Sequence, residues 1–194
     1  GGSIGFYGST LNTRQYATKG YLEKLIPQVF TGRERFEPGN PQEGYSPSPQ
    51  ERQSWLQISY MKEAYHTMGP KFTLGWMAEA LYSSKNFSEN YTATMMQAGE
   101  FAPTPHSKLM YNEAFRANQY VAAGIKPIYV LNDMFQFRTE FYGFTPIFPI
   151  KKNALNKAYY GKAFSRFEYM GEVSVICHLP FGAISAYVNH YSSP

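Results

Sequence analysis

The chain has 194 residues, of which 43% are hydrophobic, 18% aromatic and only 16% charged, and its formal net charge is +4 at pH 7. This length suits one domain, and the mild charge, whose longest basic run is Lys151-Lys152, gives no indication of a nucleic-acid partner. The single Cys177 excludes an internal disulfide framework and a cysteine metal cluster, and no apolar run is long enough to predict a transmembrane helix.

Stretches of β-type sequence follow one another along the chain, separated by polar or Gly- and Pro-rich connections. Alternation in the second stretch is blurred around Pro27, where we expect a bulge. The segment that follows, 37–52, is rich in Pro, Gly and Ser and is expected to be a loop. The expected strands, in chain order, are 3–11, 20–36, 53–66, 71–85, 118–131, 134–148, 166–179 and 183–191.

The clearest alternation lies at 71–85. A period of two over about 15 residues predicts one long strand with two unlike faces. Strands of globular proteins usually have about 5–6 residues, whereas a tilted strand that crosses a bilayer needs about 9–11. The apolar parity of this strand comprises Phe72, Leu74, Trp76, Ala78, Ala80 and Tyr82.

The longest connection is 86–117, and within it 92–97 fits either a short helix or a strand. Short turns near Gly69, Asn132 and Gly182 alternate with long loops, an asymmetry typical of outer-membrane barrels. Charged residues of the last strands share one parity: Arg138, Glu140, Arg166, Glu168 and Glu172. We therefore predict an all-β fold, an antiparallel up-and-down transmembrane β-barrel whose charged parity lines a lumen and whose aromatic parity faces lipid.

A soluble, ligand-binding β-barrel of about eight strands is an alternative of a different class. Its apolar parity would face the interior and its charged parity the solvent, which is the inverse of the membrane arrangement.

The residues that could carry chemistry are few. Gly1-Gly2-Ser3-Ile4-Gly5 matches the G-x-S-x-G elbow of serine hydrolases, but the elbow needs a strand before the serine and a helix after it, and the residues that follow have no helical periodicity. The four histidines lack the spacing of a metal site; they are His66, His106, His178 and His190. We expect no catalytic residue, no metal and no cofactor.

Two runs in the middle of the chain give a resemblance to a known family. The segments 101–108 (FAPTPHSK) and 115–124 (FRANQYVAAG), together with 12–39, resemble the C-terminal barrel of Bacteroidetes-type patatin-like phospholipases, which belongs to the bacterial surface antigen superfamily. The resemblance extends over essentially the whole chain and rests on a diffuse pattern, without an invariant motif.

The resemblance implies a barrel of about 16 strands, of which residues 1–194 would be the C-terminal half, truncated at both ends and supplying about eight strands. It implies a long extracellular loop that folds into the lumen and carries an arginine at its tip. Arg116 occupies this place, although Ala117 and Asn118 depart from the family's Gly-aromatic pair. Its expected partners on the barrel wall are Glu140, Glu168 and Glu172.

The function implied by the resemblance is a bacterial outer-membrane segment that anchors a patatin-like lipid acyl hydrolase, with a role in its secretion left open. The catalytic residues would lie upstream, so this chain is not expected to be an enzyme. Its expected partners are outer-membrane lipids, the remainder of the barrel and the periplasmic and patatin domains, and a homodimer is left open. The alternative within the superfamily is an outer-membrane insertase or two-partner secretion transporter with no hydrolase.

Overall fold

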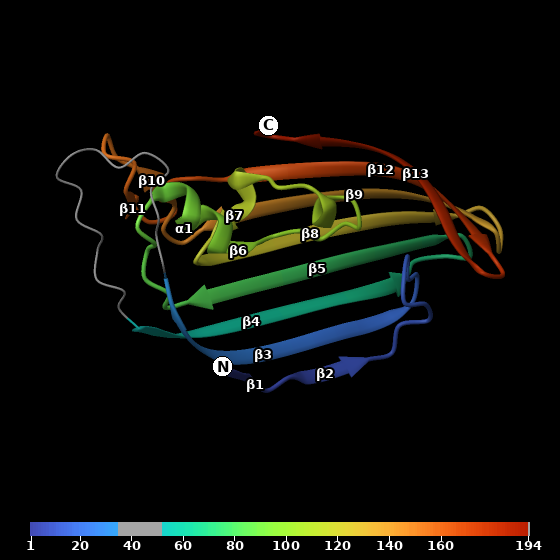
Figure 1. Ribbon diagram of the computed structural model, residues 1–194. Helices are drawn as coiled ribbons and strands as arrows, with labels where there is room; N and C mark the ends of the chain where they lie inside the picture. Colours follow the sequence, from blue (N-terminus) through green and yellow to red (C-terminus); the bar gives the residue numbers. More distant parts are fainter. Residues whose placement is uncertain (35–51, 194) are drawn as a thin grey trace.

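A computed structural model describes residues 1–34 and 52–193. Its main element is one antiparallel sheet of nine strands in the order β1-β3-β4-β5-β8-β9-β12-β13, with β2 also paired to β3. Figure 1 shows these long strands side by side in a single curved layer. The bounds are β1 (Gly2–Ser3), β2 (Phe6–Ser9), β3 (Gly20–Arg33), β4 (Arg52–Thr67), β5 (Phe72–Ser83), β8 (Gln119–Val130), β9 (Phe135–Pro146), β12 (Glu168–Leu179) and β13 (Gly182–Tyr191).

The predicted all-β, antiparallel, up-and-down fold is confirmed. Since β1 and β2 are two pieces of one edge strand along β3, the sheet has about eight strand positions, as the sequence predicts. The strands of the described residues form an open sheet and do not close into a barrel. The loop expected at 37–52 lies outside the described residues, apart from Arg52, which begins β4.

The bulge expected at Pro27 is wrong. The β3–β4 register runs without interruption from Gly20 opposite Tyr65 to Arg33 opposite Arg52. Pro27 turns its backbone toward the edge of the sheet, where its carbonyl accepts a hydrogen bond from the Ile4 N–H at 3.1 Å. The N–H that proline lacks therefore falls at the gap between β1 and β2, and no ladder bond is lost.

The connection at 84–118 folds over one face of the sheet, which we call the inner face; the opposite face is the outer face (Figure 1). This connection contains α1 (Tyr91–Gln97), β6 (Gly99–Glu100), two 3-10 turns, η1 (Ser107–Leu109) and η2 (Glu113–Phe115), and β7 (Arg116–Ala117). The segment at 92–97 is thus helical. The side chain of Asn90 caps its N-terminus by accepting a hydrogen bond from the Ala93 N–H at 2.8 Å.

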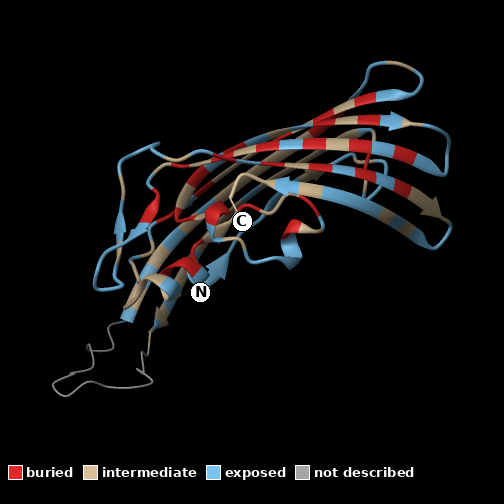
Figure 2. Cartoon of the chain, turned by 90° about the horizontal axis from the view of Figure 1, so that it is seen from above, coloured by how far each residue is buried: buried red, intermediate tan, exposed pale blue. Residues whose placement is uncertain are grey.

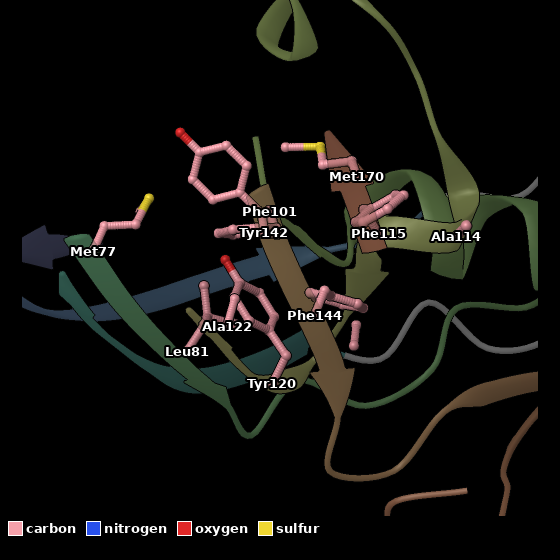
Figure 3. Close-up of a cluster of buried hydrophobic side chains, with 11 residues drawn as sticks. Met77, Leu81, Phe101, Ala114, Phe115, Tyr120, Ala122, Tyr142, Phe144 and Met170 are labelled. Carbon is pink, nitrogen blue, oxygen red and sulfur yellow. The ribbon is translucent and has the colours of Figure 1, made fainter. Parts of the chain in front are cut away.

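The apolar core lies between this connection and the inner face. Phe101 and Phe115 are 1% and 2% exposed, and both pack on the ring of Phe144 from β9, with centroid distances of 5.9 and 5.6 Å (Figure 3). Tyr120 and Tyr142 complete the aromatic cluster from β8 and β9. The core therefore fixes the connection against the strands of the inner face.

The two faces of the sheet have inverted polarity. On the inner face Arg138, Glu140 and Glu172 are 3%, 6% and 7% exposed, whereas on the outer face Phe141 and Val173 are 53% and 56% exposed. Figure 2 shows buried and exposed residues alternating along the strands. The inner face thus buries charged groups beside its apolar core, and the outer face exposes large apolar groups, unlike the water-facing side of a soluble sheet.

Connections of different length lie at opposite ends of the sheet. Tight turns join β4 to β5, β8 to β9 and β12 to β13 at one end, which we call the short-turn end. The opposite end, the loop end, carries 84–118 and 147–167, the latter with a hairpin of β10 (Ile150–Lys152) and β11 (Ala158–Tyr160). One longer connection, 10–19, lies at the short-turn end and folds over the inner face, where Arg138 donates to the Ala17 carbonyl at 3.0 Å.

Close packing at Gly124 gives a stability prediction. A Cβ atom at Gly124 would lie 2.2 Å from Cδ1 of the buried Tyr142 ring, whereas a Cβ at Gly171 of β12 would have no contact closer than 3.5 Å. We expect Gly124→Ala to lower the free energy of unfolding by about 1–3 kcal/mol and Gly171→Ala to change it little. Urea unfolding of the refolded variants, followed by circular dichroism, measures both. Equal midpoints for the two variants would contradict this packing.

Candidate functional site on the inner face

A buried ion pair crosses the inner face from β8 to β4. Lys126 Nζ lies 2.8 Å from Glu63 Oε2, and the two strands are separated by β5. On β5, Gly75 is opposite Lys126 on one side and Tyr65 on the other, and a Cβ there would lie 2.7 Å from the Tyr65 ring and 3.1 Å from Lys126 Cβ. The missing side chain at Gly75 therefore allows Lys126 to reach over β5 to its partner.

A second buried pair lies on β9. Arg138 Nε donates to Glu140 Oε1 at 3.0 Å, and the Tyr142 hydroxyl donates to the other carboxylate oxygen of Glu140. The Arg138 guanidinium also bonds the Ala17 carbonyl and lies 5.8 Å from the centroid of the Tyr16 ring. The charge of each group is thus compensated inside the fold, as burial requires.

Glu172 of β12 is directly opposite Glu140 in the β9–β12 register. One of its carboxylate oxygens is buried and has no hydrogen-bond partner among the described residues. Glu172 and Glu140 line a cavity of about 950 Å³ between the inner face and the connections 10–19 and 84–118. Its charged lining residues are Arg14, Lys24, Lys108, Lys126, Arg138, Glu63, Glu79, Glu140 and Glu172.

The cavity wall carries charges of both signs, and these determine which ligands it suits. The wall contains both cations and carboxylates, so the cavity suits water and small polar groups of either charge. Glu79 is held by the Tyr120 hydroxyl at 2.5 Å. Among the described residues no cluster of three or more His, Cys, Asp or Glu side chains is arranged to hold a metal ion.

The structure places Arg116 at the base of the 84–118 connection. Its guanidinium lies 2.5 Å from Glu100 Oε2, its directly opposite neighbour in the β6–β7 pair. It also donates to the carbonyls of Met95, Met96 and Ala98 at 3.1–3.3 Å, which are groups at the C-terminus of α1. Arg116 therefore links the end of the 84–118 connection to the C-terminus of α1 and to Glu100 within the same connection.

Arg116 and its three expected partners are not brought together. Glu140 pairs with Arg138, as described above, and Glu168 bonds Arg166 Nε at 2.8 Å and the hydroxyls of Ser192 and Ser193 at 2.5 and 2.8 Å. In residues 1–34 and 52–193, none of the ion pairs joins Arg116 to Glu140, Glu168 or Glu172. The three glutamates do face inward, and all are less than 9% exposed.

The N-terminus of α1 is fixed to η2 by another polar contact. The Tyr91 hydroxyl donates to the Glu113 carboxylate, and burial together with this carboxylate raises the pKa of Tyr91 well above its ordinary value. Tyr91 therefore stays protonated across the physiological range and keeps its donor role.

Three other residues considered as candidates in the sequence make contacts that are part of the fold. Ser3 lies in β1 opposite Gln28, and His106 bonds the Tyr187 hydroxyl at 2.7 Å. His178 lies 2.8 Å from the Gln136 amide nitrogen on the inner face. Over the described part of the chain, no helix has the length and apolar character needed to span a membrane.

Comparison with known proteins finds no match to a family model, to a curated protein or to a solved structure. The resemblance to patatin-like phospholipase barrels therefore stays a prediction.

Two features of the site were missed from the sequence. The sequence gives no reason to place Tyr16 and Ala17 against β9, since the signal is a contact over more than 100 residues. Gly75 could have been found, because a glycine in the middle of a regular strand signals a close approach.

Arg116 gives a test of the loop closure. Because its guanidinium holds Glu100 and the α1 carbonyls together, we expect Arg116→Ala to weaken this connection by about 1.5–3 kcal/mol and to speed amide exchange over 91–100. Lys108→Ala is the matched control, since Lys108 is an exposed cation in the same connection. Hydrogen–deuterium exchange with mass spectrometry measures the effect, and similar exchange in both variants would contradict the assignment.

The Arg138–Glu140 pair gives a second test. Glu140→Leu leaves the Arg138 guanidinium buried beside an apolar group and is expected to cost about 3–5 kcal/mol of unfolding free energy. Combining it with Arg138→Met removes the unpaired charge, and the double variant should recover most of the loss. A double variant less stable than Glu140→Leu would show that the two charges are not coupled.

Proposed function

We propose that this chain is a wall segment of a bacterial outer-membrane β-barrel whose outer face contacts lipid. The observation that carries the proposal is the inverted polarity of the sheet. A soluble barrel needs its apolar residues inside, whereas here the inner face holds buried charges and the outer face exposes large apolar side chains such as Ile125, Phe141 and Val173.

The dimensions of the strands suit this role. Strands β5, β8, β9 and β12 each have 12 residues, so each extends over about 40 Å. A tilted strand of about 9–11 residues crosses the hydrocarbon layer. Apart from the 10–19 connection, tight turns lie at one end and long connections at the other, as on the two sides of outer-membrane barrels.

A polar cluster of the described residues lies on the outer face, and its groups are paired with one another. Lys62 Nζ of β4 lies 3.4 Å from Glu23 Oε2 of β3, and the Tyr60 hydroxyl donates to Glu23 Oε1 at 2.6 Å. Opposite charges that satisfy each other are the form in which ionisable groups occur within membranes. This cluster is compatible with a lipid-facing surface.

The two edges of the sheet need partners. In the part of the chain that the structure describes, β13 pairs only with β12, and β1 and β2 pair only with β3. In a bilayer an unpaired edge is prohibitively costly, so the proposal includes further strands that complete the barrel. Following the resemblance, the proposed role is to anchor a patatin-like hydrolase, with any role in its secretion still open.

Refolding in the presence and absence of detergent micelles tests the proposal. We expect far-UV circular dichroism of residues 1–194 to show β-structure that forms only with micelles. A cooperative, monomeric β-fold in plain buffer would overturn the membrane proposal.

Val175→Arg tests the lipid contact at one position. Val175 is exposed on the outer face in the middle of β12, and an arginine near the bilayer midplane costs about 2–4 kcal/mol. Urea unfolding from micelles or vesicles should show this loss, whereas the control Val175→Leu should keep the stability of the parent chain. Equal stability of the two variants would mean that this surface meets water.

A further inference from the structure

The outer face carries an isolated pair of opposite charges on β3 and β4. Glu23 and Lys62 are directly opposite each other in the β3–β4 register. Away from the strand ends, no other Asp, Glu, Lys or Arg lies on the outer face of the described nine-stranded sheet. The neighbours of Glu23 along β3 on this face are Tyr21 and Leu25, and both are exposed. The pair therefore interrupts a surface that is mostly apolar.

The contacts within the pair leave hydrogen-bonding groups unused. Lys62 Nζ lies 3.4 Å from Glu23 Oε2, and this is its one hydrogen bond to another described residue. An ammonium group has three N–H donors. The side chains of Lys62 and Glu23 are still 37% and 39% exposed. Pairing makes the cluster tolerable in a membrane, but lipid chains offer no acceptor for the donors that remain.

Small residues flank the pair on both sides. Gly8 of β2 is directly opposite Glu23. Ala78 of β5 is directly opposite Lys62, and Ala123 of β8 follows in the same row. Between transmembrane helices, small residues allow close approach and polar residues form hydrogen bonds across the interface. The same steric and hydrogen-bonding argument applies to two facing sheets, so the row has the composition of a protein contact within a membrane.

We propose that two copies of this chain associate in the membrane through the outer faces of β3 and β4, with Lys62 of each copy bonded to the partner's Glu23. The inference rests on the proposed function, since it requires the outer face to lie in the membrane. A two-fold axis parallel to the membrane normal, placed between β3 and β4, sets β3 of one copy against β4 of the other. Opposite charges on these neighbouring strands then meet at both contacts. This self-complementarity favours a second copy over an unrelated protein.

An exchange of charge between the copies tests the interface. Glu23→Lys gives a chain with lysine at both positions, and Lys62→Glu gives a chain with glutamate at both, so each variant repels its own second copy. A mixture of the two variants restores opposite charges at both contacts. The single cysteine, Cys177 of β12, takes a donor or an acceptor dye. Energy transfer between labelled chains in phosphatidylcholine vesicles measures association, and far-UV circular dichroism of the same samples measures β-structure.

We expect the unaltered chain to associate and either single variant alone to raise the apparent dissociation constant by about tenfold or more, because like charges then face each other. The mixture of the two variants should recover the affinity of the unaltered chain. The matched control is the double variant Glu23→Lys with Lys62→Glu, which keeps opposite charges within and between copies and should associate like the unaltered chain. Recovery in the mixture cannot come from misfolding, since both of its components associate weakly alone.

The outcomes separate the interface from the proposed function. Equal energy transfer in the single variants and the unaltered chain would place the contact elsewhere, such as at the free edges of the sheet, and would overturn this interface. A mixture without recovery would overturn the bond between Lys62 and the partner's Glu23. Chains that form β-structure in the vesicles without energy transfer would overturn the dimer and leave the lipid-facing wall in place. Chains that fold in buffer and do not enter vesicles would overturn the proposed function and this interface with it.

Discussion

The rest of the structure depends on the compensation of charge on the inner face. Removing Arg138, Glu140, Lys126 and Glu63 from water is costly, and each pair offsets this cost by direct contact. Glycine at position 75 leaves space on β5 for the Tyr65 ring and for the Lys126 side chain, which extends toward Glu63 of β4. One pair thus joins β8 to β4 across β5, and the other holds two residues of β9 together beneath the 10–19 connection.

The larger apolar cluster on the inner face lies toward the loop end, and a smaller one of Ala17, Tyr65 and Ile128 lies toward the short-turn end. At the loop end Phe101 and Phe115 bring the 84–118 connection onto β8 and β9, and Arg116 joins the two ends of that connection. The inner face is therefore divided along the strands into an aromatic core and a charged cavity. An interior filled in this way supports the curved sheet from within while its apolar residues remain outside.

Much of the fold could be predicted from the sequence because a strand's period of two is a local property. Alternation identified each long strand and assigned Glu140, Glu168 and Glu172 to one face, where the structure finds them buried. The partner of Arg116 could not be predicted, since Glu100 faces it only through the two-residue β6–β7 pair. The bulge predicted at Pro27 is wrong because the sequence does not show which neighbouring strand the proline nitrogen faces. It faces the edge of the sheet, so the missing N–H removes no ladder bond.

The hydrogen bond between Tyr16 and Ser185 has a mechanical consequence. Tyr16 belongs to the connection beside β3, and its hydroxyl donates at 2.8 Å to a serine of β13, at the far edge of the sheet. The contact therefore links the two edges of the curved sheet, which no strand pairing of the described residues joins. The Tyr16 backbone that holds this side chain in place has a positive φ of 54°, so a link between the two edges at the short-turn end depends on one residue in the left-handed region.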